Sequence, residues 1–224
     1  MVSLSTGVID SIMLAIHCAF IGSGFLTVQP FSRSLQAESL KMTVLMSMLM
    51  HVGRLVRRMG VPRSSSAILP WIQTVAPTTE VFNVGCTLLM LINRSASMVF
   101  VSQGILAIYH AASLLNAVLH GGSKVVQDAY KYLGQKQRKA LLLMGLCDLF
   151  ALVQLLLACT HLGIRGALNV YMYLGMLKGR YKSPESVSYH QEAWALVGKY
   201  TRPLLIRVPL LDRLSTSAIR WFVQ

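Results

Sequence analysis

Charged residues are scarce in this chain of 224 residues. Asp, Glu, Lys and Arg together make up 13% of it, whereas a soluble globular domain carries roughly 25%. Hydrophobic residues make up 54%, and the mean hydropathy is +0.55. This composition argues against a soluble domain and predicts an integral membrane protein. The apolar runs are continuous, whereas a membrane β-barrel needs alternating strands, so we expect an all-α fold.

Acidic residues are the scarcest charged group. The chain has 8 of them against 21 Lys and Arg, which gives a net charge of +13. A nucleic-acid-binding protein can show the same excess. Here the positive residues avoid the apolar runs and gather in residues 54–63, 124–139 and 178–220. Clusters beside membrane segments are explained more simply by helix orientation and attraction to anionic lipid head groups. We therefore expect an anionic lipid surface as a partner, and no nucleic acid.

Motifs for catalysis and metal binding are missing from the sequence. The four cysteines all lie inside apolar runs with no Cys-x-x-Cys spacing, which is typical of buried apolar side chains and not of a disulfide framework. The six histidines show no i, i+4 pair, and there is no glycine-rich phosphate loop and no nucleophile elbow. We expect a non-enzymatic protein without a cofactor or a metal site.

What the chain does contain is a set of long apolar runs around a basic centre. Residues 98–119 and 140–162 are each about 22 residues long, enough for a helix to cross roughly 30 Å of hydrocarbon. Between them, residues 121–139 (GGSKVVQDAYKYLGQKQRK) hold five cations and one acid. Short basic loops stay on the cytoplasmic side, so we predict a cytoplasmic loop here.

Three more apolar segments complete the predicted membrane domain. Residues 8–28 form a candidate span that ends at Gln29-Pro30, because a helix rarely continues through the residue before proline. A second apolar helix is predicted to start at Pro77-Thr78-Thr79-Glu80, which places an acid in its first turn, and to meet the next run through a tight turn at residues 93–97. Gly163-Ile164-Arg165-Gly166 predicts another tight hairpin, with a short return over residues 167–177.

Residues 35–59 have a different pattern. Thr43, Ser47, His51, Arg54 and Arg58 are spaced by 4, 4, 3 and 4 residues, which puts them on one stripe of a helix. The remaining positions are mostly Leu, Val and Met. This pattern favours an amphipathic helix that lies in the membrane interface. The alternative is a crossing helix whose polar stripe faces the bundle.

The C-terminal segment, residues 188–224, is also amphipathic and basic. We predict it as a tail separate from the membrane domain of residues 1–187. Pro203 and Pro209 are expected to kink or split its helix. Its basic side would bind anionic lipid while its aromatic residues insert. The predicted lipid-binding residues are Trp194, Lys199, Arg202, Arg213, Arg220 and Phe222. The alternative is a helix that packs within a small cytoplasmic cap.

Asp148 is the most informative single residue. It lies about nine residues into an apolar run, where a charge is costly and is usually paired or functional. One interpretation is a proton or ion relay with Gln154 or His161. The other is a structural role, in which Asp148 makes an interhelical hydrogen bond or is protonated on burial.

Three patches along the chain resemble the transmembrane protein 33 family. TLLMLINRSASMVFVSQGILAIYHAASL is similar to the central hairpin of that family. Cys147-Asp148-Leu149-Phe150 resembles its Cys-polar-x-x-Phe patch, and Leu177-Lys178-Gly179-Arg180-Tyr181 resembles its Leu-x-x-Arg-Tyr exit. The resemblance implies a non-enzymatic multi-pass protein of the endoplasmic reticulum membrane and nuclear envelope. It also implies an amphipathic C-terminal segment that senses curved membrane, and reticulon-like or nuclear pore membrane proteins as partners.

The first hypothesis is therefore a protein that shapes or scaffolds endoplasmic reticulum and nuclear envelope membrane. Nuclear pores are one site that this hypothesis includes, and a homo-oligomer is one form. Two alternatives remain from the sequence. One is a structural subunit of a larger membrane complex. The other is a small transporter or channel that uses Asp148.

Overall fold

The computed structural model describes residues 6–28, 33–62, 64–92, 98–119 and 123–207, together with positions 213, 216, 217 and 220. Within these residues every regular element is a helix and there is no strand, so the all-α prediction is confirmed. The elements are α1 (Thr6–Val28), α2 (Arg33–Met59), a 3-10 turn (Ser65–Ala67), α3 (Ile68–Val75), α4 (Thr79–Ile92), α5 (Met98–Val118), α6 (Lys124–Lys182) and α7 (Val187–Leu205).

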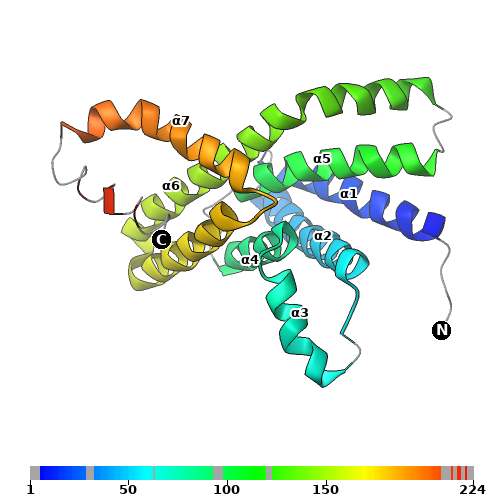
Figure 1. Ribbon diagram of the computed structural model, residues 1–224, viewed down its shortest axis with the longest axis horizontal. Coiled ribbons are helices and arrows are strands. Elements are labelled where there is room, and N and C mark those ends of the chain that lie inside the picture. Colours follow the sequence, from blue (N-terminus) through cyan, green and yellow to red (C-terminus); the bar gives the residue numbers. More distant parts are fainter. Residues whose placement is uncertain are drawn as a thin grey trace.

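Five helices enclose a common interior. α1 packs on α2 and α5, α5 packs on α6, and α4 packs on both α2 and α6, so the contacts form a closed ring. α7 lies on α6, and α3 projects away from the ring (Figure 1). In the part of the chain that is described, three helices are long and apolar enough to cross a membrane: α1, α5 and α6.

α1 and α2 form an antiparallel pair. At one end the Thr27 and Thr43 hydroxyls lie 3.1 Å apart, and at the other end Arg57 forms an ion pair with Asp10. α1 ends at Val28, next to the Gln29-Pro30 pair, in agreement with the predicted end.

The polar stripe of α2 faces the interior. Thr43, Ser47 and His51 are fully buried, while Leu45 and Leu49 on the other side of the helix are about half exposed. An interfacial helix would keep its polar side in water, so the interfacial interpretation of this helix is wrong. The stripe faces the bundle, as in the alternative, a crossing helix. That α2 crosses the membrane stays a prediction, since α2 is not among the three helices that are long and apolar enough for a span.

The basic connector is helical. α6 begins at Lys124 and continues without a break into the following apolar run, so residues 124–139 are helix and the predicted loop is wrong. The reason is local: residues 124–139 contain no proline and are rich in Lys, Gln and Arg, which are good helix formers. This segment runs antiparallel to α5, and the Tyr109 hydroxyl donates to the Leu133 carbonyl at 3.1 Å. None of its residues is buried, so its cations stay in contact with solvent. The cytoplasmic side of this segment stays a prediction.

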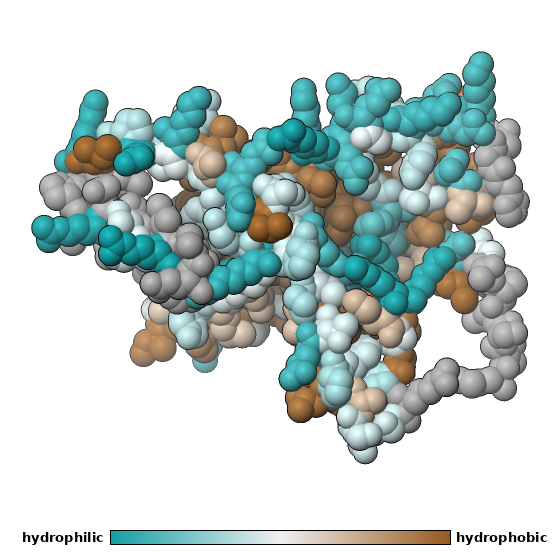
Figure 2. All heavy atoms as spheres, viewed as in Figure 1, coloured by the Kyte–Doolittle hydropathy of each residue, from teal (hydrophilic) through white to brown (hydrophobic). Residues whose placement is uncertain are grey.

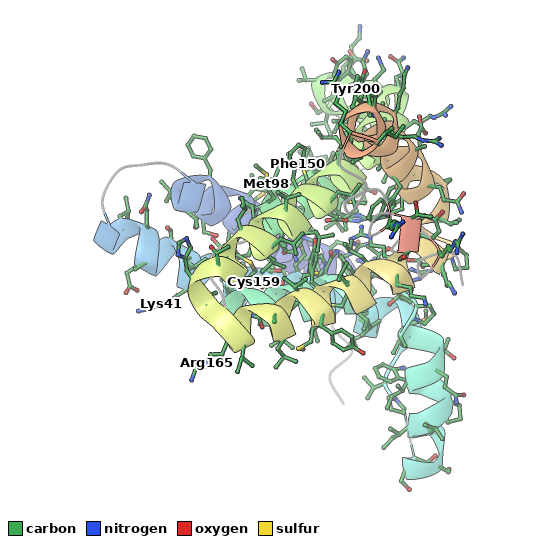
Figure 3. The ribbon with its side chains drawn as sticks, turned by 90° about the vertical axis from the view of Figure 1, so that its left-hand side faces the viewer. Lys41, Met98, Phe150, Cys159, Arg165 and Tyr200 are labelled. Carbon is green, nitrogen blue, oxygen red and sulfur yellow. The ribbon has the colours of Figure 1, made fainter. Side chains whose placement is uncertain are left out.

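The predicted hairpin after residue 162 is confirmed. Gly163 has φ 55° and ψ −131°, which interrupts α6 and reverses the chain. Only glycine adopts this conformation readily. Gly166 has a different reason to be glycine: a Cβ there would lie 2.8 Å from Cys159 Cα. Figure 3 shows Cys159 and Arg165 on the two arms beside the turn.

α4 starts where the sequence predicts, with Thr79 as its first residue and Glu80 in its first turn. The predicted tight turn at residues 93–97 lies outside the described residues. α4 and α5 meet through side chains, because Gln103 Nε2 donates to the Asn83 carbonyl and to Thr87 Oγ1, each at 3.1 Å.

α7 begins at Val187, one residue before the predicted start of the tail at residue 188. Its buried side belongs to the same core as the other helices, since Ala193 is fully buried and lies in the main apolar cluster. The helix continues through Pro203 to Leu205, so it is not split at that proline. Pro209 lies outside the described residues.

Candidate functional site

A buried ionic cluster lies where α6 and α7 meet. Arg180 Nη1 is 3.2 Å from Asp148 Oδ2, and His190 Nε2 is 3.4 Å from the same oxygen. The three residues are at most 3% exposed. The hairpin turn at Gly163 brings Arg180 back beside Asp148, and α7 then places His190 against both.

Arg180 also connects this cluster to α4. Its Nη2 donates to the Tyr189 hydroxyl at 3.1 Å, its Nη1 lies 3.4 Å from Asn83 Oδ1, and its guanidinium stacks 4.4 Å from the centre of the Phe82 ring. The Arg180 carbonyl accepts a hydrogen bond from the Ser186 hydroxyl at 2.5 Å. One side chain therefore holds α4, both arms of α6 and α7 together.

This geometry favours the structural role of Asp148. The relay interpretation named Gln154 and His161 as its partners. Gln154 instead accepts a hydrogen bond from the Met98 backbone N–H at 3.1 Å, and His161 is exposed. The partners of Asp148 are Arg180 and His190, which the sequence analysis did not select. Arg180 stood out only as part of a family patch, and nothing in the local sequence pairs it with Asp148.

Polar side chains lie among the apolar side chains in the interior of the helix ring. The Ser47 hydroxyl lies 2.8 Å from Thr87 Oγ1 and donates to Gln103 Oε1 at 2.7 Å. Further along, the rings of His17 and His110 meet edge to face with their centres 6.0 Å apart. α1, α2, α4 and α5 all contribute to this interior. The stripe on α2 was visible in the sequence, but its partners on the other helices were not.

Ion pairs close one end of the bundle. Arg54 pairs with Glu80 at 3.1 Å, and Arg58 pairs with Glu185 at 2.5 Å. The Glu185 carboxylate also accepts hydrogen bonds from the Thr79 backbone N–H at 3.1 Å and from the Thr79 hydroxyl at 3.0 Å. Glu185 lies in the link between α6 and α7, and it satisfies a free N–H at the start of α4.

Glu185→Gln is expected to destabilise the fold by about 1 kcal/mol at neutral pH. Burial acts to raise the pKa of Glu185, but the hydrogen bonds from Thr79 and Arg58 outweigh it and hold the pKa below the ordinary 4.5. The charged form is therefore favoured in the folded state, and its stabilising contribution is present above pH 4.5 and lost as the pH falls through the lowered pKa. The unfolding temperatures of wild type and Glu185→Gln should differ at pH 7, and this difference should disappear as the pH falls to 3. A difference that is constant with pH would contradict the charge-based account.

The predicted lipid-binding residues of the tail lie apart from the ionic cluster. Lys199 and Arg202 are exposed on α7, and positions 213 and 220 are exposed. Trp194 is half-buried and packs against the main core cluster, so it would have to leave this packing in order to insert into lipid. Phe222 lies outside the described residues. Lipid binding by these residues stays a prediction.

Among the residues that the structure describes, no three His, Cys, Asp or Glu side chains are grouped so that they could hold a metal ion. No family model, curated protein or solved structure matches this chain. The resemblance to the transmembrane protein 33 family therefore stays an expectation.

Proposed function

We propose that this chain is a non-enzymatic multi-pass membrane protein that shapes or scaffolds the membrane in which it lies. The observation that carries the proposal is that polar side chains are buried beside the apolar core while many large apolar side chains lie on the outside. His17, Thr43 and Ser47 are 0% exposed, whereas Leu157 is 65% and Ile164 90% exposed. In water this arrangement would be unfavourable, because it buries polar groups and exposes apolar ones. In a bilayer the same arrangement is favourable, since polar side chains face the bundle interior and apolar ones face lipid.

The shaping role is supported by an uneven distribution of hydrophilic residues over the surface. On the face seen in Figure 2, hydrophilic residues gather along the upper edge, over the first part of α6 and over α7. These two segments carry two of the basic clusters. An edge of this kind suits a layer of anionic head groups, while the apolar faces suit hydrocarbon. A protein that occupies one leaflet more than the other favours curved membrane.

The location and the partners rest on the family resemblance. On that basis the membrane would be the endoplasmic reticulum and the nuclear envelope, and the partners would be reticulon-like or nuclear pore membrane proteins. A tagged full-length chain at native expression should give a reticular pattern with a nuclear rim. Confinement to another organelle would contradict this part of the proposal and favour a subunit of another membrane complex.

Charge reversal at Lys199, Arg202, Arg213 and Arg220, each to Glu, is expected to weaken membrane shaping. The full-length chain, reconstituted into vesicles that contain phosphatidylserine, should reduce vesicle diameter as the protein-to-lipid ratio rises. The reversed variant should lose most of this effect, because each cation near an anionic surface contributes about 1 kcal/mol. Vesicle diameter is measured by electron cryomicroscopy.

The matched control exchanges Lys and Arg at the same four positions and so keeps the charge. Vesicles of equal diameter with the wild-type and the charge-reversed protein would rule out the lipid-anchor role of the tail. A truncation at Ser186 is a poorer test, because it also removes Tyr189, His190 and Ala193 from the core.

A further inference from the structure

α3, the short helix that projects from the bundle, exposes an apolar side. Ile68, Leu69 and Ile72 are 45%, 65% and 47% exposed. Gln73 and Thr74, which are also exposed, lie on the other side of the helix at 100° per residue. The one buried residue of α3 is Val75, at its last position. α3 is therefore amphipathic, and its apolar side is open except where Val75 meets the bundle.

The position of α3 is fixed by contacts at both of its ends. On one side of the helix Trp71 Nε1 donates to the Gly60 carbonyl, just after the end of α2, at 3.1 Å. The link from α3 to α4 is also held, because the Ser183 hydroxyl at the end of α6 donates to the Pro77 carbonyl at 2.7 Å. Together with the buried Val75, these contacts set the direction in which the apolar side of α3 faces.

α3 lies at the end of the bundle that is closed by ion pairs, since it connects the end of α2 to the start of α4. There Arg57 and Arg58 pair with Asp10 and Glu185, and both arginine side chains are still 50% exposed. Figure 3 shows the returning arm of α6 running from the turn beside Arg165 toward this end, where α3, drawn in cyan, runs across its direction. In a bilayer, a helix that runs across the spanning helices at their basic end lies along the membrane plane, at the depth of the head groups.

We propose that α3 is an interfacial anchor, whose apolar side contacts the acyl chains of the leaflet at the basic end of the bundle. Ile68, Leu69 and Ile72 make this contact, while Gln73 and Thr74 stay among head groups and water. An amphipathic helix with a tryptophan and with neighbouring arginines has the composition of segments that bind in this boundary. The proposal rests on the membrane location proposed above, and it concerns a different segment from the basic tail.

A second copy of the chain is the main competing occupant of this apolar side. A stable protein interface buries about 800 Å² on each partner and involves roughly 20 residues of each. α3 has 8 residues, so it is about 12 Å long, and its open apolar side consists of the three side chains named above. This area is too small to hold two proteins together by itself. Acyl chains need no matching surface of that size, so the small area favours lipid.

The test uses the full-length chain with one nitroxide spin label, reconstituted into vesicles of phosphatidylcholine and phosphatidylserine. Cys18 and Cys159, the native cysteines that are not buried, are first replaced by alanine. Ile72→Cys then places the label on the apolar side of α3. Electron paramagnetic resonance compares how often the label collides with molecular oxygen, which concentrates in hydrocarbon, and with a nickel chelate, which stays in water.

The matched control is Thr74→Cys, an exposed position two residues further along the same helix and on its polar side. The ratio of oxygen to nickel collisions should be about tenfold higher at residue 72 than at residue 74, because hydrocarbon excludes the chelate. Val153→Cys is the membrane reference, since Val153 is 49% exposed in the apolar part of α6. Its ratio should be at least as high as the ratio at residue 72.

A low ratio at residue 72 with a high ratio at residue 153 would overturn the proposal, because α3 would then lie in water beside a membrane-embedded bundle. A low ratio at residue 153 would contradict the membrane location itself, and with it the proposed function. Dipolar broadening between labels at residue 72 would overturn the proposal in favour of a second copy of the chain. A label at residue 72 that is shielded from both reagents would also overturn it, because protein would then cover this side of α3.

Discussion

Asp148→Asn is expected to cause a large loss of stability, about 3 kcal/mol or more. The substitution keeps the shape of the side chain but leaves the Arg180 guanidinium, which is 3% exposed, without its counter-ion at 3.2 Å. An unpaired buried charge costs far more than the pair itself contributes, because the desolvation of the charge is no longer offset. For a chain of this length the loss corresponds to a drop of about 6–12 °C in unfolding temperature. The measurement is thermal unfolding in detergent.

Two controls make the Asp148 result specific. Asp128→Asn is the same chemical change on the same helix at an exposed position, and it should change the unfolding temperature little. The double variant Asp148→Leu with Arg180→Met removes both charges and should recover much of the lost stability. A single variant as stable as wild type would show that the pair does not hold the two arms of α6 together. It would also return the transporter alternative to consideration, with ion flux as the measurement.

Gly166→Ala is expected to lower the free energy of unfolding by about 2 kcal/mol. The added Cβ would lie 2.8 Å from Cys159 Cα, and a backbone atom cannot move aside as the end of a side chain can. The two arms of the α6 hairpin would have to separate next to the turn at Gly163. Unfolding in detergent should occur about 4–8 °C lower than for wild type.

The control for Gly166 is Gly134→Ala, also in α6. A Cβ there meets no atom within 4 Å, so the change should stabilise the helix by up to about 1 kcal/mol. A lower unfolding temperature in Gly166→Ala, together with a higher one in Gly134→Ala, would confirm that close packing, and not helix propensity, requires glycine at position 166. A neutral or stabilising Gly166→Ala would mean that the arms are further apart than described.

Local signals predicted the helices and several of their ends. α4 begins at the Pro77-Thr78-Thr79-Glu80 start signal, and the chain reverses at Gly163, because caps, prolines and glycine turns act through neighbouring residues. The connector was mispredicted because its basic composition, which reports on the side of the membrane, was taken to mean a loop. A basic segment can also form a helix, and residues 124–139 are both basic and rich in good helix formers.

The amino-acid sequence by itself determined that this protein is helical, apolar and basic, because composition and periodicity are properties of the chain alone. Only the tertiary structure decided which way the polar stripe of α2 faces and which residues neutralise Asp148. Those outcomes depend on contacts between residues far apart in the chain, such as Asp148 with Arg180 and Ser47 with Gln103. A buried polar group needs some partner, but the identity of that partner is set by how the helices pack.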